Sequence, residues 1–297
     1  MRADRELYLR GMHTVVASWA AYAHGSPGAA VVRSPGVAAA VFPHEPARAV
    51  YNNAVLDRDL GSAERAGALA AMESAYAAAA VTRFAAWVHE SDHAMIADLG
   101  ARGYTLDTST RAMGMILDEI RLPRPAIDRA PPDWSEYLRV LELPTGLLDD
   151  VDQSVFHVQI ARLDGENVTA GMAFDLDSDC GIYNVGTRER ARRQGLATAV
   201  TALLAHEAAG RGCRTVTLQS TEMAERVYAA VGFRDLGRIL EFVPAVTGQA
   251  SSEVCIARDL IRGSPAGRNA RAAPGCGSTS GRRSPRRGTR RRRRRAP

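Results

Sequence analysis

The chain has 297 residues, 46% hydrophobic and 24% charged, which is a globular composition and enough length for two domains of about 100–200 residues. Collagen-like, coiled-coil and wholly disordered chains are excluded, and no membrane span or membrane partner is expected, because two histidines, a glycine and a proline interrupt the uncharged stretch 11–32. The net charge of +5 averages two unlike parts: residues 262–297 carry 13 arginines and no acid, whereas residues 1–261 carry 25 basic against 33 acidic groups, a balance of −8.

The four cysteines lie far apart, without a C-x-x-C pair or a histidine spacing that would hold a metal, so we expect reduced thiols and no metal. The uncharged N-terminal run ends in Ala21–Ala23, as signal peptides do before cleavage, but Asp4 and Glu6 lie where a signal peptide is basic. Its apolar residues follow helical spacing, which favours an amphipathic helix and a cytoplasmic protein. The cysteines are Cys180, Cys213, Cys255 and Cys276.

Residues 1–121 are expected to form one α/β domain. Apolar runs separated by turn residues indicate strands, and alanine-rich stretches indicate helices. Proline-rich residues 122–133 are the predicted linker to a second domain. The expected elements of the first domain are a helix over 4–23, strands over 29–32 and 37–42, a helix over 62–80, a strand over 83–88, a helix ending near 102 and a strand over 111–117.

Residues 134–261 are expected to form the second domain. The pair Asp164-Gly165 predicts a hairpin, because it favours the tight turn that joins antiparallel strands. We expect helices over 134–148, 195–209 and 222–231, and strands over 154–162, 167–174, 181–186, 215–218 and 239–243.

The arginine-rich end of the chain, 262–297, has almost nothing to bury and is predicted to be disordered. Its run Arg290–Arg295 would bind nucleic acid through phosphates alone, in a salt-sensitive and sequence-independent way. Because the segment has no aromatic residue for base stacking, a nucleic-acid partner is not favoured.

The segment 185–197, V-G-T-R-E-R-A-R-R-Q-G-L-A, carries the strongest chemical signal. It lies between a predicted strand and a predicted helix, and Gly195 lets the backbone approach a ligand closely. A helix start presents unpaired N–H groups and the positive end of the helix dipole, which together bind anions. The surrounding arginines favour a di- or triphosphate. The alternative is that Gly195 only allows the chain to enter the helix.

The order strand, strand, strand, R192-x-x-G195-x-A197, helix, strand, helix with Tyr228, then Gly232-Phe233, resembles the GNAT superfamily of acyl-CoA-dependent N-acetyltransferases over about residues 150–245. The resemblance implies an α/β fold with a central mixed, twisted sheet flanked by helices. It also implies acetyl-CoA as cosubstrate and direct transfer of the acetyl group to a primary amine of a small molecule or peptide.

Carried over residue by residue, the resemblance assigns the end of a strand to the pantetheine and acyl carbonyl of acetyl-CoA, and the following loop and helix start to its pyrophosphate. Ala197 departs from the glycine common in the family, which tolerates the change. The strand-end residues are Val185, Gly186 and Thr187, and the pyrophosphate residues are Arg192, Arg193, Gln194, Gly195, Leu196, Ala197 and Thr198.

Tyr228 matches the tyrosine that protonates the departing CoA thiolate in the family. A phenol of pKa ~10 gives its proton to a thiolate of pKa ~8.5 only if geometry and the local field assist. The alternative is a helix tyrosine packed against the sheet. The strand before the loop lacks the carboxylate that many family members use as general base, and Glu222, Gln219 and His157 are each better explained structurally. This gap leaves a non-catalytic acyl-CoA-binding sensor as the alternative function.

The first half resembles a degenerate GNAT repeat. Leu99 and Gly103-Tyr104 align with Tyr228 and Gly232-Phe233, but the half has no glycine-containing phosphate loop. The chain is therefore expected to contain two tandem repeats, the first without acetyl-CoA; the alternative is chance similarity of two helix-to-strand corners. The first half is expected to form one wall of the acceptor cleft. The candidate residues for this wall are Asn52, Asn53, Trp87 and His89, and each of them could instead lie in a turn or in the core.

Overall fold

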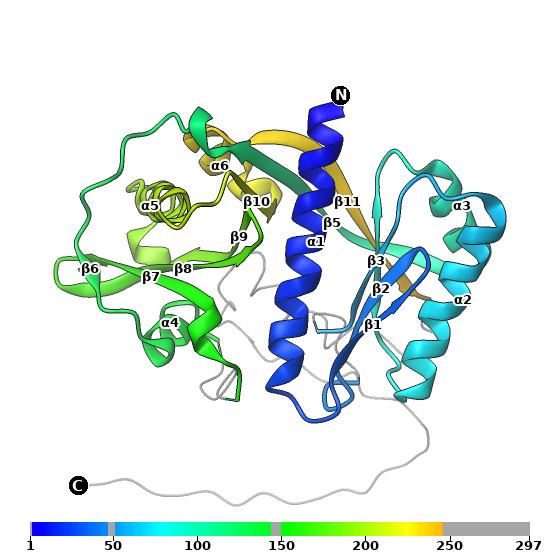
Figure 1. The fold of residues 1–297 in the computed structure, drawn as a ribbon. Coiled ribbons are helices and arrows are strands. Elements are labelled where there is room, and N and C mark those ends of the chain that lie inside the picture. Colours follow the sequence, from blue (N-terminus) through cyan, green and yellow to red (C-terminus); the bar gives the residue numbers. More distant parts are fainter. Residues whose placement is uncertain (1, 47–50, 144–149, 246–297) are drawn as a thin grey trace, which may run out of the picture. The chain divides into compact units, whose positions relative to one another are not determined.

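Eleven strands among the described residues lie side by side in one mixed sheet, in the order β1-β2-β3-β4-β11-β5-β10-β9-β8-β7-β6 (Figure 1). The computed structural model describes residues 2–46, 51–143 and 150–245. The expected fold class, an α/β protein with a central mixed sheet flanked by helices, is confirmed. Within these ranges, no helix has the length and apolar character needed to cross a membrane.

The elements follow one another in the same order in both halves of the chain: a helix, three strands, a helix, a strand, a helix and a long strand. The first run is α1 (Arg2–His24), β1 (Ala30–Ser34), β2 (Val37–Val41), β3 (Asn53–Leu56), α2 (Ser62–Ala78), β4 (Ala85–His89), α3 (His93–Ala101) and β5 (Tyr104–Ile116). The second is α4 (Trp134–Val140), β7 (Phe156–Leu163), β8 (Glu166–Leu176), β9 (Asp179–Thr187), α5 (Leu196–Gly210), β10 (Thr215–Ser220), α6 (Glu225–Val231) and β11 (Arg234–Pro244). The two-residue strand β6 (Arg129–Ala130) lies between the runs, and single 3-10 turns occur at Leu117–Glu119, Gln153–Val155, Glu189–Ala191 and Glu222–Ala224.

The last strand of each half lies among the strands of the other half. β11 pairs antiparallel with β4 and β5, and β5 pairs antiparallel with β10. The pairing types repeat as well, because β3 is parallel to β4 as β9 is to β10, whereas the two preceding pairs in each half are antiparallel. Each half therefore depends on a strand that the other half supplies.

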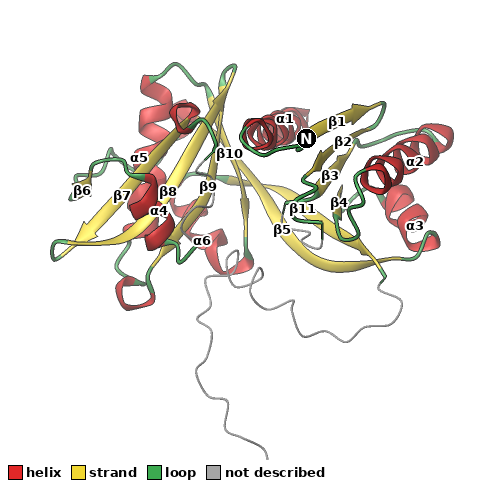
Figure 2. Cartoon of the chain, turned by 90° about the horizontal axis from the view of Figure 1, so that it is seen from below, coloured by secondary structure: helices red, strands yellow, loops and turns green. Residues whose placement is uncertain are grey.

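Four helices cover one face of the sheet, and α1 and α4 cover the other. Leu204 of α5 and Val231 of α6 share a buried cluster, and Leu69 of α2 and Leu99 of α3 share another. Residues of α1 form a third cluster with strands of both halves, including Val55 of β3. Figure 2 shows α1 and the pair α2 and α3 on opposite sides of β1–β3.

α1 is fixed to the sheet at the base of β9 and β10. Gly11 lies so close to the sheet that a Cβ there would be 3.0 Å from Cβ of Thr217. The buried carboxylate of Asp179 accepts hydrogen bonds from the hydroxyls of Thr14 at 2.6 Å, Thr215 at 2.6 Å and Thr217 at 2.9 Å. Asp179 therefore ties the helix to both strands.

Replacing Asp179 by alanine is expected to lower the free energy of unfolding by about 3 kcal/mol, because two buried hydroxyls and the half-buried hydroxyl of Thr215 lose their acceptor. Asp179→Asn keeps an oxygen acceptor and is expected to lose less. Urea denaturation of the three proteins measures the difference, and an unchanged midpoint in Asp179→Ala would contradict this account of α1.

Most predicted elements are confirmed, and the following differ. The strand expected over 239–243 begins at Arg234. The sequence pattern did not predict β3, which is only four residues long. The strand expected over 111–117 begins at Tyr104, because its first residues pair with β11. The helix expected over 134–148 ends at Val140, and residues 144–149 lie outside the described ranges, as does the tail predicted to be disordered. The predicted linker contains β6, which pairs with β7. The domain ranges 1–121 and 134–261 stay a prediction.

Candidate functional site

β9 and β10 pair at one end and diverge along their length, and the region between their diverging ends is called the wedge. They pair over only three positions, where Asp179 to Gly181 face Thr215 to Thr217. β10 continues to Ser220 in pairing with β5, and β9 continues to Thr187 in pairing with β8. The backbone of β9 after Gly181 therefore has no strand partner on the side of β10, and an extended ligand could pair there as an added strand.

A bulge turns β9 as it runs along this wedge. The register with β8 shifts between Ala170 and Met172, and Asn184 has a left-handed backbone with φ of +52°. Gly186 faces α4, because a Cβ there would lie 2.5 Å from Cδ2 of Leu141. The bulge and the small residue let the strand end pass close beneath Leu141.

The loop after β9 turns back towards the start of α5. The carbonyl oxygen of Thr187 accepts a hydrogen bond from Nε of Arg192 at 3.2 Å, which fixes the arginine beside the strand end. Arg193 and Gly195 both have left-handed backbones, with φ of +67° and +78°. Arg193, Gln194 and Gly195 are exposed, so this side of the loop is open to solvent.

The N-terminus of α5 presents its free N–H groups at the wide end of the wedge. The N–H of Ala199 donates to the carbonyl of Gly195 at 2.9 Å and makes the first bond of the helix. The N–H groups of Leu196, Ala197 and Thr198 precede that bond and point out of the helix end. Nothing lies within 4 Å of a Cβ built on Gly195. The site thus has the open space and the donors that an anionic group needs.

The arginines around the loop differ in their partners. Arg190 forms an ion pair with Glu166, and Arg188 donates to the carbonyl of Arg139 at 3.0 Å. Among the described residues, Arg193 forms no ion pair, and its exposed guanidinium adds positive charge beside the helix start. The structure brings the ten residues predicted to bind the cosubstrate into this one strand end, loop and helix start.

Tyr228 lies on α6, in the hydrophobic core beneath β10. Its side chain is 7% exposed, and its ring packs edge-on against Phe233 at 6.0 Å. Burial raises the pKa of Tyr228 to about 12, so the hydroxyl holds its proton at neutral pH. The core packing of the tyrosine is clear, and its role as an acid remains a prediction.

Of the three groups considered as bases, Gln219 and Glu222 lie close together at the end of β10, whereas His157 lies on β7. Glu222 is exposed in the turn before α6, and Gln219 on β10 is half-buried. Nε2 of His157 lies 3.5 Å from Asp175, which in turn binds Arg211 directly after α5. Since α5 has 15 residues and is about 22 Å long, His157 lies near the end of the helix opposite Gly195.

The four residues of the first half that were expected to line an acceptor cleft lie in different structural environments. Asn52 is buried and holds a turn, accepting from the N–H of Phe42 and donating to the carbonyl of Glu45. His89 lies 3.0 Å from the carbonyl oxygen of Leu236, and burial lowers its pKa. Asn53 lies in β3, and the ring of Trp87 meets Trp19 of α1 edge-on at 5.1 Å. Asn52 thus stabilises a turn, and Trp87 lies on the face of the sheet that α1 covers.

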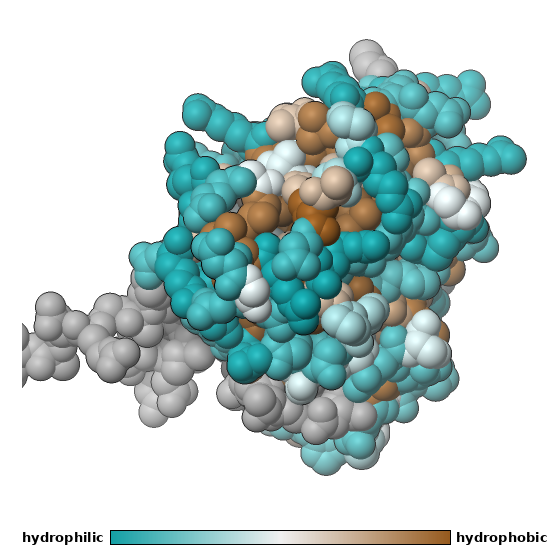
Figure 3. Space-filling view, turned by 90° about the vertical axis from the view of Figure 1, so that its left-hand side faces the viewer, coloured by the Kyte–Doolittle hydropathy of each residue, from teal (hydrophilic) through white to brown (hydrophobic). Residues whose placement is uncertain are grey.

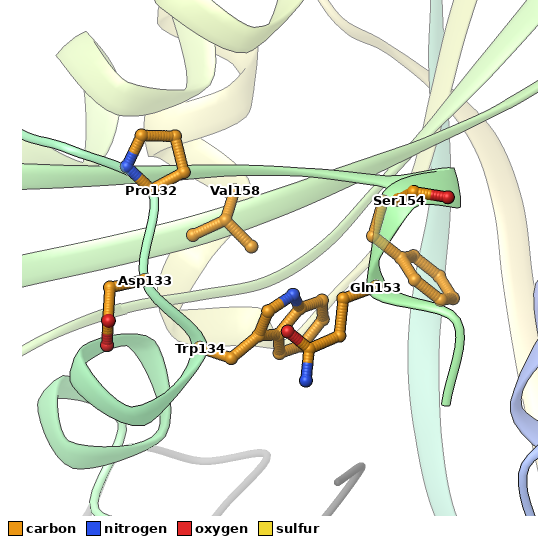
Figure 4. A pocket seen from close by; sticks show the side chains of 7 residues that line it. Pro132, Asp133, Trp134, Gln153, Ser154 and Val158 are labelled. Atoms are coloured by element: carbon orange, nitrogen blue, oxygen red, sulfur yellow. The ribbon is translucent and has the colours of Figure 1, made fainter. Parts of the chain in front are cut away.

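A cavity of about 350 Å³ lies away from the wedge, between the start of α4 and the start of β7, and Trp134 lines it (Figure 4). The ring of Trp134 meets that of Phe156 edge-on at 5.9 Å. The polar side chains of the cavity are engaged locally: Asp133 caps α4 by accepting from the N–H of Glu136. Figure 3 views the protein from the side of β6 and β7, where apolar residues emerge among hydrophilic ones. In the described ranges, no group of His, Cys, Asp or Glu is arranged to hold a metal.

The sequence reasoning missed Glu241 in the middle of β11. Its side chain is 9% exposed and has no hydrogen bond or ion pair with the described residues. Burial, reinforced by the charge of Asp107, raises the pKa of Glu241 to about 7. The available signal was an acid between Leu240 and Phe242, two residues that pack on the opposite face of the sheet.

Replacing Glu241 by glutamine is expected to stabilise the protein above pH 7 by about 3 kcal/mol. The folded carboxyl titrates near pH 7 and the unfolded one near 4.5, so ionisation favours the unfolded chain increasingly between these values and fully above them. Denaturation midpoints of both proteins from pH 4 to pH 9 measure the gap. A gap that does not widen as the pH rises would contradict the burial of an uncompensated carboxyl.

The comparisons with known proteins bear on the family and the fold. The model of the acetyltransferase (GNAT) family matches residues 117–233. A GCN5-related N-acetyltransferase from Kribbella flavida has a similar fold, with a TM-score of 0.60 and 19% identity over 80% of this chain and 97% of that one. A tandem GNAT protein from the clavulanic acid biosynthesis pathway has a TM-score of 0.50 and 16% identity, over 75% of this chain and 86% of that one.

A conserved protein of unknown function from Staphylococcus epidermidis gives a TM-score of 0.52 and 12% identity over 72% of this chain and 92% of that one. No curated protein matches the sequence. The resemblance noted in the sequence is thus confirmed by the family model and the fold. Residues 117–233 match the acetyltransferase (GNAT) family, and this part of the chain is similar to the domains of that family.

Proposed function

We propose that the protein is a cytoplasmic N-acetyltransferase that transfers an acetyl group from acetyl-CoA directly to a primary amine, without a covalent enzyme intermediate. One observation carries the proposal: the open N-terminus of α5, with Gly195 in the left-handed region, follows β9, whose backbone after Gly181 has no strand partner on the side of β10. The family supports acyl transfer in general, and the acetyl donor and amine acceptor are the finer part of the proposal.

The residues of the wedge suit acetyl-CoA. The N–H groups from Arg193 to Thr198 would hold the pyrophosphate, and the strand end from Val185 to Thr187 would pair with the pantetheine. Acetyl-CoA supplies an acyl thioester that an amine can attack. Tyr228 holds a proton on Oη at neutral pH. Because burial raises its pKa to about 12, it is a weaker acid than a free phenol, and transfer of the proton to the thiolate requires a direct hydrogen bond between the two groups.

The site needs no dedicated carboxylate base in the wedge. Positioning two reactants in a productive geometry contributes about 7–11 kcal/mol, and the amine proton can pass to water. The acidic balance of residues 1–261 fits an acceptor that arrives as a cation.

Release of free thiol from acetyl-CoA, measured against a panel of primary amines, tests the proposal. Thiol release that depends on an amine, with one acetyl group gained by that amine in mass spectrometry, is expected. Tight acetyl-CoA binding with no thiol release for any amine would contradict catalysis and favour the sensor function instead.

Tyr228→Phe is expected to lower kcat by about 10²–10⁴-fold, because the departing thiolate loses its proton donor, while the Kd of CoA changes little. Tyr76→Phe is the matched control, because it removes another buried tyrosine hydroxyl from a helix in the first half. Equal kcat in the two variants would show that Tyr228 serves packing alone.

A further inference from the structure

A row of side chains on the α1 face of the sheet joins the two halves beside the wedge. Trp87 of β4, Glu241 of β11 and Thr108 of β5 lie directly opposite one another in the antiparallel register, so they point to the same face. The next row brings Thr110 opposite Ile239. Ile239 packs in the cluster that α1 covers, which identifies the face.

Three polar groups in these rows are left without partners. Nε1 of Trp87 and Oγ1 of Thr110 are buried and have no hydrogen bond, and the Thr110 side chain is 7% exposed. The carboxyl of Glu241 likewise has no hydrogen-bond or ion-pair partner in the described part of the chain, although its neighbours could supply donors. Buried polar groups are normally satisfied, so this set on one face can pair with polar groups of a ligand.

This arrangement costs stability, because an uncompensated buried carboxyl favours the unfolded chain. Glutamine at position 241 would fit the same space without a charge. A buried charge that lowers the stability of the fold without contributing to it is typical of a binding site. Trp87, which lies directly opposite Glu241 in the sheet, and Trp19, whose ring meets that of Trp87, are both half-buried. Carboxylates and aromatic rings together favour ammonium groups.

Glu241 lies within reach of the wedge, where the proposed acetyl transfer would take place. One strand, β5, separates β11 from β10, which places Glu241 roughly 10 Å from the line of β10. β10 ends where Ser220 faces Arg111, and Thr108 lies three residues farther along β5, on the side where the wedge widens. A molecule about 10–15 Å long, by the same strand spacing, would reach from this carboxyl to the wedge.

We infer that Glu241 binds a second cationic group of the acceptor, so that the substrate is an elongated diamine or polyamine with one nitrogen held under α1 and another presented in the wedge. This inference rests on the proposed acetyl transfer for the second nitrogen only. Glu241 acts by binding and positioning, and it does not touch the reacting atoms.

Calorimetric titration of diaminooctane and aminooctanol into the full chain at pH 8 tests the inference, because the two differ only in the terminal ammonium. The diamine is expected to bind about tenfold tighter. Glu241→Gln should remove this preference while folding at least as well. Asp107→Asn, which removes a nearby charge without changing the row, should keep the preference.

Equal affinities in the unaltered protein, a preference that survives in Glu241→Gln, or its loss in Asp107→Asn as well would each overturn the inference. Acetylation of the same amines separates the two proposals. If the diamine binds through Glu241 but neither amine is acetylated, the transferase fails and the cation site stands. If both amines are acetylated with equal KM and Glu241→Gln changes nothing, the transferase stands and the cation site fails.

Discussion

Ending the chain at Phe233 is expected to abolish cooperative unfolding of both halves, because β11 is the shared strand of the sheet. β11 pairs with β4 over four positions and with β5 over nine. It buries Ile239, Phe242 and Leu236, and partly buries Leu240. At about 1.5–3 kcal/mol for each apolar side chain, the loss is comparable with the ~5–15 kcal/mol that stabilises an ordinary domain.

A chain that ends at Ala245 is the control, because both truncations remove residues 246–297 and they differ only by β11. We expect the longer chain to show one cooperative transition in circular dichroism and the shorter chain to show none. Cooperative unfolding of the shorter chain at an unchanged midpoint would mean that β11 is not needed by the first half. Residues 1–121 could then fold as a separate domain.

Gly195→Val is expected to weaken CoA binding by about 10–100-fold. The left-handed backbone of Gly195 costs a β-branched residue roughly 1–3 kcal/mol, so the loop would relax away from the geometry that presents its N–H groups. No protein atom lies within 4 Å of the new Cβ, so a clash inside the protein would not explain the loss.

Gly212→Val provides a matched control at the other end of α5. Gly212 also has a positive φ, +97°, and nothing lies within 4 Å of a Cβ built there. It should therefore reduce stability by a similar amount and leave the affinity for CoA unchanged. Equilibrium dialysis with CoA measures both variants, and equal losses in the two would assign the effect to general destabilisation.

The candidate site was readable from the sequence because its signals are local. A strand, the loop around Gly195 and the helix after it are consecutive in the chain, and the turn chemistry of glycine and the spacing of Leu196, Val200 and Leu204 reveal them without knowledge of distant contacts. A repeat was also indicated, because Gly103-Tyr104 and Gly232-Phe233 mark the same corner in each half, but the full order of elements repeats only once β3 is included.

The pairing of the sheet was not readable, since alternation within a strand shows which residues share a face and not which strand lies alongside. β5 and β11 have the pattern of closing strands in their own halves, yet each lies among the strands of the other half. The family model likewise ends at Phe233, just before β11, and begins after β5, so the matched domain lies between the two exchanged strands.

Glu241 shows a related limit. An acid in a strand of the sequence reads as a solvent-facing residue, and only the packing of α1 over both halves makes this one buried. Its effect on stability and its role in binding arise from contacts between segments more than 100 residues apart.

The central claim is that main-chain nitrogens at the start of α5 bind the pyrophosphate of coenzyme A. Calorimetric titration of CoA into the unaltered protein tests it most directly. We predict saturable binding with one site per chain and an affinity that falls when the phosphate-free fragment pantetheine replaces CoA. No measurable heat at any temperature between 10 and 35 °C, or equal affinity for pantetheine, would contradict the claim.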